Sequence, residues 1–127
     1  MEKGAAARAA TGERRRKILD AALRCFADEG YEATTLSHIR ARSGASTGSI
    51  YHLFASKEEI AGAVYVDGLR CYQEGFLAVV EQRESPEAMV RACVEFYLEW
   101  VEANERLARF IVHTRHAELV PAVRDEL

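Results

Sequence analysis

The chain has 127 residues, of which 49% are apolar and 29% are charged, and its formal net charge is −3. This length and apolar content suit one ordinary domain or two small ones and exclude a globally disordered chain. The acidic excess also argues against a protein that binds nucleic acid over its whole surface.

The charge is unevenly distributed along the chain. Residues 1–60 carry ten Lys and Arg against eight Asp and Glu, whereas residues 61–127 carry seven against twelve. The first 17 residues hold six basic and two acidic side chains, including the run from Arg14 to Lys17. A basic head on an acidic body fits a protein that contacts a polyanion with one end only.

The sequence also limits location and chemistry. It has neither an apolar run as long as a membrane span nor the apolar stretch of a signal peptide, so we expect a cytoplasmic protein. Cys25, Cys71 and Cys93 are far apart in apolar helical contexts, which predicts small buried side chains in a reducing compartment. His113 and His116 have a spacing that a metal could use, but no third ligand lies nearby. We expect no metal and no cofactor.

Helical periodicity and only two prolines predict an all-α fold. Residues 1–12 are Ala-rich without an apolar period, which indicates a flexible basic arm. From residue 13 to residue 29, apolar side chains recur at spacings of three and four. Gly30 ends this first helix as a C-cap, and Tyr31 is the apolar residue that often follows such an end.

Two short helices follow the first one. Thr34 and Thr35 offer an N-cap for a helix over 35–43, Gly44 ends that helix, and Ser46 caps another over 47–54. A brief turn containing Gly between two short helices is the helix-turn-helix geometry, in which the second helix can lie in the major groove of DNA.

The residues of the second short helix suit such a contact. Thr47, Gly48 and Ser49 form its first turn, where bulk would hold the helix away from base edges. The donors that could reach the sugar-phosphate backbone on either side are Tyr51, His52 and Lys57.

Tyr51 could instead be a core aromatic residue. Ile50 and Phe54, four residues apart, fill the buried face of this helix better. We therefore predict that the Tyr51 side chain is exposed.

A long helix is predicted over 57–81, because Ser56 and Glu59 form a capping box before an apolar run. It contains Gly62, Gly68 and Gly75, each of which costs about 1 kcal/mol relative to Ala. Either close packing against neighbouring helices or easier bending of this helix explains them.

Three more helix starts follow. Ser85 and Pro86 begin a helix that reaches Ala103. Asn104 caps a sixth helix. Pro121 opens a seventh, and the sequence stops just inside it, so we expect a longer chain whose C-terminal part is missing here.

A set of short motifs in fixed order spans residues 16–60. They are Ile18-Leu19-Asp20-Ala21-Ala22, Phe26, Gly30-Tyr31, Thr34-Thr35-Leu36, Ile39, Ser43-Gly44-Ala45-Ser46, Gly48-Ser49-Ile50-Tyr51, Phe54 and Ser56-Lys57-Glu58-Glu59-Ile60. Their joint order and spacing resemble the DNA-binding domain of the TetR (tetracycline-repressor-like) family of bacterial transcription regulators. Arg40 and Ser43 depart from that pattern, because Ala is common at both positions, and Thr47 replaces a frequently basic residue.

The resemblance implies a helix-turn-helix DNA-binding domain over 13–56 and a helical effector-binding and dimerisation domain over 57–127. The residues that it assigns to DNA contact are Thr35, Thr47, Ser49, Tyr51, His52 and Lys57. The small first turn of the second short helix adds Gly48 to this set. The aromatic candidates for an effector pocket are Tyr65, Tyr72, Phe96, Trp100 and Phe110.

The function that we expect is sequence-specific regulation of transcription. A homodimer would repress at double-stranded operator DNA and would leave it when a small-molecule effector binds. The alternatives are a DNA-binding architectural module without an effector and an all-helical enzyme. The enzyme is disfavoured because the sequence offers no nucleophile–base pair, metal cluster or phosphate loop.

Overall fold

The computed structural model describes residues 2–82 and 85–114, and all secondary-structure elements in this part are α-helices. They are α1 (Glu2–Glu29), α2 (Leu36–Ser43), α3 (Thr47–Leu53), α4 (Lys57–Glu81), α5 (Pro86–Ala103) and α6 (Glu105–His113). The predicted all-α fold is therefore confirmed. The predicted seventh helix at Pro121 lies outside the described residues.

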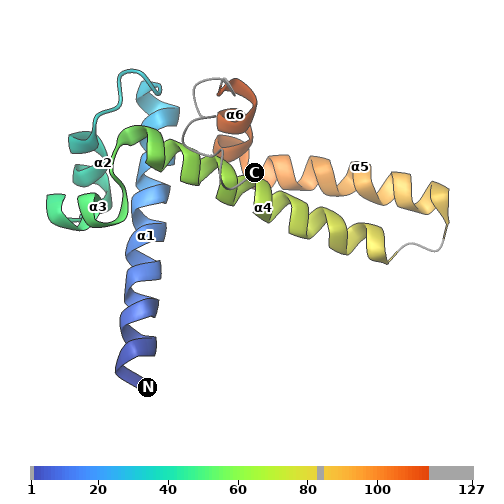
Figure 1. The fold of residues 1–127 in the computed structure, drawn as a ribbon. Helices are drawn as coiled ribbons and strands as arrows, with labels where there is room; N and C mark the ends of the chain where they lie inside the picture. Colours follow the sequence, from blue (N-terminus) through green and yellow to red (C-terminus); the bar gives the residue numbers. More distant parts are fainter. Residues whose placement is uncertain (1, 83–84, 115–127) are drawn as a thin grey trace.

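The helices form two parts (Figure 1). The first, called the head, consists of α1, α2, α3 and the start of α4, and the second is an elongated hairpin of α4 and α5. The C-terminal half of α1 packs against α2, and α3 lies next to α2 at the same end. Helix α4 leads out of this head and packs along α5, while α6 returns to contact both α1 and α4. The head thus holds the helix-turn-helix, and α4 connects it to the rest of the chain.

Two glycines end helices in the left-handed conformation that side chains rarely adopt. Gly30 has φ 84° and Gly44 has φ 71°, and their N–H groups bond to carbonyls four residues earlier. The rings of Phe26 and Tyr31 lie 5.3 Å apart, which is the apolar contact expected across such a helix end. The predicted ends of α1 and α2 are confirmed.

Serine and threonine side chains begin α2, α3, α4 and α5 as predicted. The side-chain oxygens of Thr35, Ser46, Ser56 and Ser85 each accept an N–H three residues on, which satisfies one of the free donors of the helix start. In a capping box the glutamate also accepts the backbone N–H of the N-cap residue, which would be Ser56 in α4. Here the Glu59 carboxylate instead accepts the N–H of Ala55, one residue earlier, at 2.7 Å.

One hydrophobic core joins α1, α2, α3, α4 and α6. Its largest fully buried apolar side chains are those of Ile18, Ile39, Ile50, Ile60 and Cys25. Each isoleucine comes from a different helix of the head or its junction with α4, so the four helices share one buried centre. This core fixes α3 on the head and leaves its opposite face outside.

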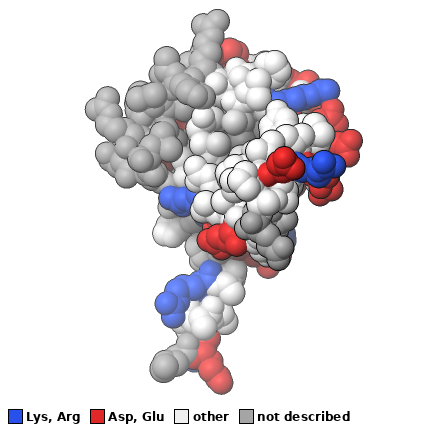
Figure 2. Space-filling view, turned by 90° about the vertical axis from the view of Figure 1, so that its right-hand side faces the viewer, with Lys and Arg blue, Asp and Glu red and all other residues white. Residues whose placement is uncertain are grey.

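The prediction of a flexible arm over residues 1–12 is wrong for the described part, because α1 begins at Glu2. Five alanines in this stretch are the strongest helix formers and outweigh Gly4 and Gly12. The side chains here are exposed, and Figures 1 and 2 show this end of α1 projecting from the rest of the molecule. The stretch is helical without a packing partner among the described residues.

Close packing explains two of the three glycines of α4. A Cβ atom at Gly68 would lie 2.7 Å from Cδ1 of Leu107, and one at Gly75 would lie 2.6 Å from Cζ of Phe96. These glycines therefore let α6 and α5 approach α4 closely. Gly62 is buried as well. The packing explanation is confirmed at Gly68 and Gly75.

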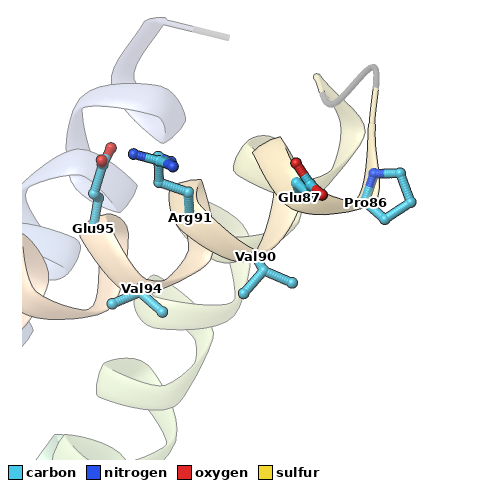
Figure 3. Close-up of a pocket in the computed structure, with 6 residues that line it drawn as sticks. All are labelled: Pro86, Glu87, Val90, Arg91, Val94 and Glu95. Atoms are coloured by element: carbon cyan, nitrogen blue, oxygen red, sulfur yellow. The ribbon is translucent and has the colours of Figure 1, made fainter.

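Helix α5 has no buried residue within the described structure, although it is rich in apolar side chains. Val90, Val94, Tyr97 and Leu98 are all more than half exposed. Val90 and Val94 project from the same side of α5 beside a shallow hollow that starts at Pro86 (Figure 3). Seen from the side of Figure 2, a broad uncharged surface separates groups of charged side chains.

Candidate DNA-binding surface

Helix α3 has one buried face and one exposed face. Ile50 and Phe54 are 2% and 6% exposed and anchor the helix in the core. Thr47, Gly48 and Tyr51 are exposed, and the Tyr51 side chain reaches 56%. His52 is exposed beside them. Residues three and four apart share a side of a helix. Such spacings connect Thr47 to Tyr51, and Gly48 to both Tyr51 and His52, so these four form one continuous outer face. The prediction that Tyr51 is not a core residue is confirmed.

The first turn of α3 is small and already organised by its cap. The Ser46 hydroxyl accepts the N–H of Ser49 at 3.1 Å and donates to the Ser49 hydroxyl oxygen at 3.1 Å. Nothing lies within 4 Å of a Cβ atom built at Gly48. Ser49 is therefore part of the cap and half-buried, whereas Thr47 and Gly48 are freely presented to the outside.

Thr35 and His38 form a capping box at the start of α2. The Thr35 hydroxyl accepts the His38 N–H, and the Thr35 N–H donates to His38 Nδ1, each at 3.2 Å. The same Nδ1 lies 2.8 Å from a carboxylate oxygen of Glu29 at the end of α1. His38 is not among the contact residues expected from the sequence. The spacing from Thr35 was the local signal for its capping role.

Lys57 is tied to the loop after α1. Its ammonium donates to the carbonyl oxygen of Tyr31 at 2.8 Å and lies 4.4 Å from the centre of the Tyr31 ring. The carbonyl of Glu32 lies 3.5 Å away. An ammonium has three donors, so this arrangement holds the loop and leaves capacity for another acceptor. The sequence suggested only the outward contact.

Basic side chains next to α3 differ in how they are held. Arg42 pairs with Asp28 at 2.7 Å, and this hydrogen bond raises the pKa of its guanidinium further. Arg40, exposed on α2, lines a small crevice together with Thr47 and Tyr51. Arg42 therefore fastens α2 to α1, whereas Arg40 lies beside the outer face of α3.

The basic run from Arg14 to Lys17 is not a uniform charged patch. Arg14 and Arg16 are exposed, and Lys17 lies 3.7 Å from the carboxylate of Glu13 on the same helix. Arg15 instead points toward α4 and binds the Asp67 carboxylate at 2.6 Å. At least one charge of the run thus serves a contact within the protein.

Three of the five predicted pocket residues gather between α4 and α5. The Tyr72 ring packs against Phe96 and Trp100, with ring centres 5.5 Å and 5.2 Å away. Tyr72 and Trp100 line a hollow of about 400 Å³ bounded also by α6. Phe96 packs against the Tyr72 ring but does not line that hollow. The Trp100 indole nitrogen is buried and has no hydrogen-bond partner within the described residues.

The other two pocket candidates lie in the core instead. Tyr65 and Phe110 are each 8% exposed, and neither lines the hollow beside Tyr72. Phe110 stacks on Phe26, with ring centres 5.5 Å apart, and thereby joins α6 to α1. Neither lines this hollow, although Phe110 borders a separate hollow between the end of α1 and α6, so their part in effector binding stays a prediction.

The cysteines differ in environment. Cys25 is buried, as predicted, and its burial raises the pKa of the thiol above the ordinary 9.0. Cys93 is half-buried, but Cys71 is exposed, so the prediction of three buried thiols is wrong at that position.

Two further predictions concern metals and membranes. His116 lies outside the described residues, and within them no group of three or more His, Cys, Asp or Glu could hold a metal. None of the described helices combines the length and apolarity that a membrane span requires.

Comparison with known proteins places this geometry in a family. A model of bacterial regulatory proteins of the tetR family matches residues 18–64, from the buried side of α1 into α4. A repressor of Mycobacterium tuberculosis, HTH-type transcriptional repressor Rv1474c, is 30% identical over 128 residues, which cover 90% of this chain and 64% of that protein. The chain belongs to the TetR family of bacterial regulatory proteins.

Other known proteins match over different lengths. HTH-type transcriptional repressor AcnR of Corynebacterium efficiens is 42% identical over 55 residues, or 40% of this chain and 29% of that protein. The solved fatty acid degradation regulator FadR from Bacillus halodurans has a TM-score of 0.77 at 20% identity and covers 88% of this chain and 59% of its own. That likeness shows the fold. The chain spans less than two thirds of the length of each of these relatives.

Proposed function

We propose that this TetR-family protein regulates transcription by binding specific duplex operator DNA through the outer face of α3. The observation that carries this proposal is the division of α3 into a face anchored by Ile50 and an outer face that presents Thr47, Gly48 and Tyr51. A helix held in this way can enter the major groove, because small residues at its start let the backbone approach the base edges.

Each predicted contact residue has a role in the proposal. Thr47, Gly48 and Ser49 face the bases from the first turn of α3. The residues that bind the sugar-phosphate backbone on both sides are Thr35, Tyr51, His52 and Lys57. Thr35 and Lys57 also make hydrogen bonds inside the head, so the positions of these two side chains are fixed before DNA binds. Such preorganisation lowers the entropy lost on binding.

The working form in this proposal is a homodimer in the bacterial cytoplasm. One head reads a single half-site, whereas two heads on one dimer read two half-sites about one helical turn, or roughly 34 Å, apart. Joining the heads raises the effective concentration of the second to about the millimolar range. In this reading residues 13–56 form the DNA-binding domain, and residues from 57 onward form the effector-binding and dimerisation domain. The protein acts by binding and catalyses no reaction.

The effector in this proposal is an apolar or aromatic small molecule. The hollow beside Tyr72 and Trp100 is lined mainly by apolar side chains, with Arg109 and His113 among its polar groups. Ligand sites commonly combine an apolar lining with a few polar groups. Binding there would shift the dimer away from the spacing that fits the operator.

The deciding experiment selects bound sequences from genomic DNA with the purified protein and measures affinity for the enriched duplex. We expect tighter binding to that duplex than to a scrambled one of equal length, and a loss of this difference in Thr47→Ala. Gln73→Ala, an exposed change on α4, is the matched control. Equal affinity for both duplexes in the wild type would favour the architectural module.

A second arm separates regulation from the alternatives. A thermal-shift screen identifies a bound small molecule, which is then added to the protein–operator complex. Release of the operator supports regulation by an effector, whereas chemical conversion of the molecule would favour the enzyme. A ligand that binds and leaves operator affinity unchanged would contradict the proposed release.

A further inference from the structure

An arginine of the basic run connects two helices that are far apart in sequence. The two guanidinium nitrogens of Arg15 donate to the two carboxylate oxygens of Asp67, at 2.6 Å and 3.4 Å. This paired geometry restricts orientation as well as distance, because a planar guanidinium and a planar carboxylate must lie nearly coplanar. The pair therefore constrains how α4 crosses α1.

The same arginine also contacts the end of α3. Its guanidinium carbon lies 5.9 Å from the centre of the Phe54 ring, at the outer limit of a cation–π contact. Phe54 caps the C-terminus of α3 and is 6% exposed. Arg15 thus bridges α1, the end of the DNA-reading helix and the third turn of α4.

The position of Asp67 on α4 is itself fixed by packing. Gly68, the next residue, allows α6 to approach so closely that an added Cβ would lie 2.7 Å from Leu107. Rotation of α4 about its axis would break that contact. The carboxylate of Asp67 is therefore a fixed anchor for the guanidinium of Arg15.

A contribution to overall stability does not account well for this pair. Its side chains are 41% and 40% exposed, and ion pairs with that much solvent contact contribute little to folding. A role in gripping phosphate does not fit either, because the carboxylate already neutralises the arginine. Orientation is the property that this bidentate, partly exposed pair supplies.

We propose that Arg15 and Asp67 are a positioning pair, which sets the orientation of the DNA-binding head on α4 and touches no DNA. This inference rests on the proposed function. Breaking either side lowers operator affinity because the head samples orientations that do not fit the duplex.

The test compares Arg15→Gln, Asp67→Asn and the exchanged double variant Arg15→Asp/Asp67→Arg in otherwise full-length protein. Each single variant should lose roughly 3- to 10-fold in operator affinity, in the lower part of the range of couplings between contacting groups. The slope of affinity against salt should stay unchanged, and the melting temperature should hardly move. The exchanged variant should recover most of the loss.

Arg14→Gln and Arg16→Gln are matched controls, because they remove the same charge from exposed neighbours. A phosphate contact at Arg15 predicts the opposite pattern: Arg15→Gln would lower the salt slope by about 1, and Asp67→Asn would tighten binding by freeing the arginine. That result, or no effect of either single change, overturns the inference.

Hydrogen exchange of residues 53–57, the connection between α3 and α4, separates this inference from the proposed function. Both single variants should speed exchange there, and the exchanged variant should restore protection, whether or not the protein selects an operator. If the wild type binds no specific duplex, the proposed function fails, but hydrogen exchange still tests the positioning role. Unchanged hydrogen exchange in both single variants contradicts the positioning role.

Discussion

The ammonium of Lys57, the first residue of α4, donates a 2.8 Å hydrogen bond to the carbonyl oxygen of Tyr31 and lies over the Tyr31 ring. The start of α4 is thereby attached to the loop that leads into the helix-turn-helix. Lys57 consequently has two roles to separate, one inside the head and one toward DNA.

Changes at Lys57 should affect both stability and DNA binding. Lys57→Met keeps the apolar stem but removes the hydrogen bond and the cation–π contact, so unfolding should become easier by about 1 kcal/mol. It should also weaken all duplexes alike and reduce the salt slope by about 1. Urea unfolding and salt titrations check these effects. A changed sequence preference with an unaltered slope would show that Lys57 reads bases.

Thr47→Ala should change sequence preference more than general affinity, with about 1–3 kcal/mol at stake for a good base contact. Thr47 is exposed on the outer face of α3, and its loss leaves the Ser46 cap intact. Ser49→Ala should combine a smaller change in preference with loss of the hydroxyl contact to Ser46. Binding selections repeated with each variant measure this. Unchanged selected sequences in both would count against base contact by α3.

Two glycines offer a matched comparison of packing and function. Gly75→Ala should destabilise the fold by about 1–3 kcal/mol, because the new Cβ would meet the Phe96 ring at 2.6 Å. Gly48→Ala has open space and should raise stability by up to about 1 kcal/mol. It should nevertheless weaken DNA binding, because the methyl group adds bulk on the outer face of α3. Chemical denaturation and operator titration test both; a more stable Gly75→Ala contradicts the packing explanation.

The three thiols should react in the order of their exposure. Under native conditions an alkylating reagent should modify Cys71 first and Cys25 last, as read by mass spectrometry of the digested protein. Burial raises the pKa of Cys25, so the folded state keeps its proton after the unfolded state loses it. The free energy of unfolding that this thiol contributes is therefore constant below pH 9.0 and falls as pH rises above that value. Early labelling of Cys25 would contradict its burial.

The aromatic residues of the hollow should control effector binding. With any ligand found by thermal-shift screening, Tyr72→Leu and Trp100→Leu should weaken binding roughly 5- to 10-fold, since each removes an aromatic contact. Tyr65→Phe is the matched control, because Tyr65 is buried in the core and does not line the hollow. Calorimetry measures the affinities. Weaker binding in Tyr65→Phe alone would place the site elsewhere.

The sequence by itself determined where α1 and α2 end and where α3, α4 and α5 begin. The caps at Ser46, Ser56 and Ser85 and the glycine ends at Gly30 and Gly44 act within about four residues, so their geometry is encoded locally. The alternation of anchored and outward residues on α3 follows from helical periodicity for the same reason. The prediction for residues 1–12 failed because it considered only the apolar pattern. The intrinsic helix propensity of alanine favours a helix even without an apolar face.

Only the tertiary structure decided the partners of side chains that can point either way. Arg15 meets Asp67 52 residues along the chain, and Lys57 meets Tyr31 across 26 residues. Basic side chains on an exposed helix look alike in sequence, and the crossing of helices settles which ones turn inward. The aromatic residues follow the same rule: Tyr65 joined the core and Tyr72 the hollow, because the face that α4 presents to each neighbour depends on how the helices pack.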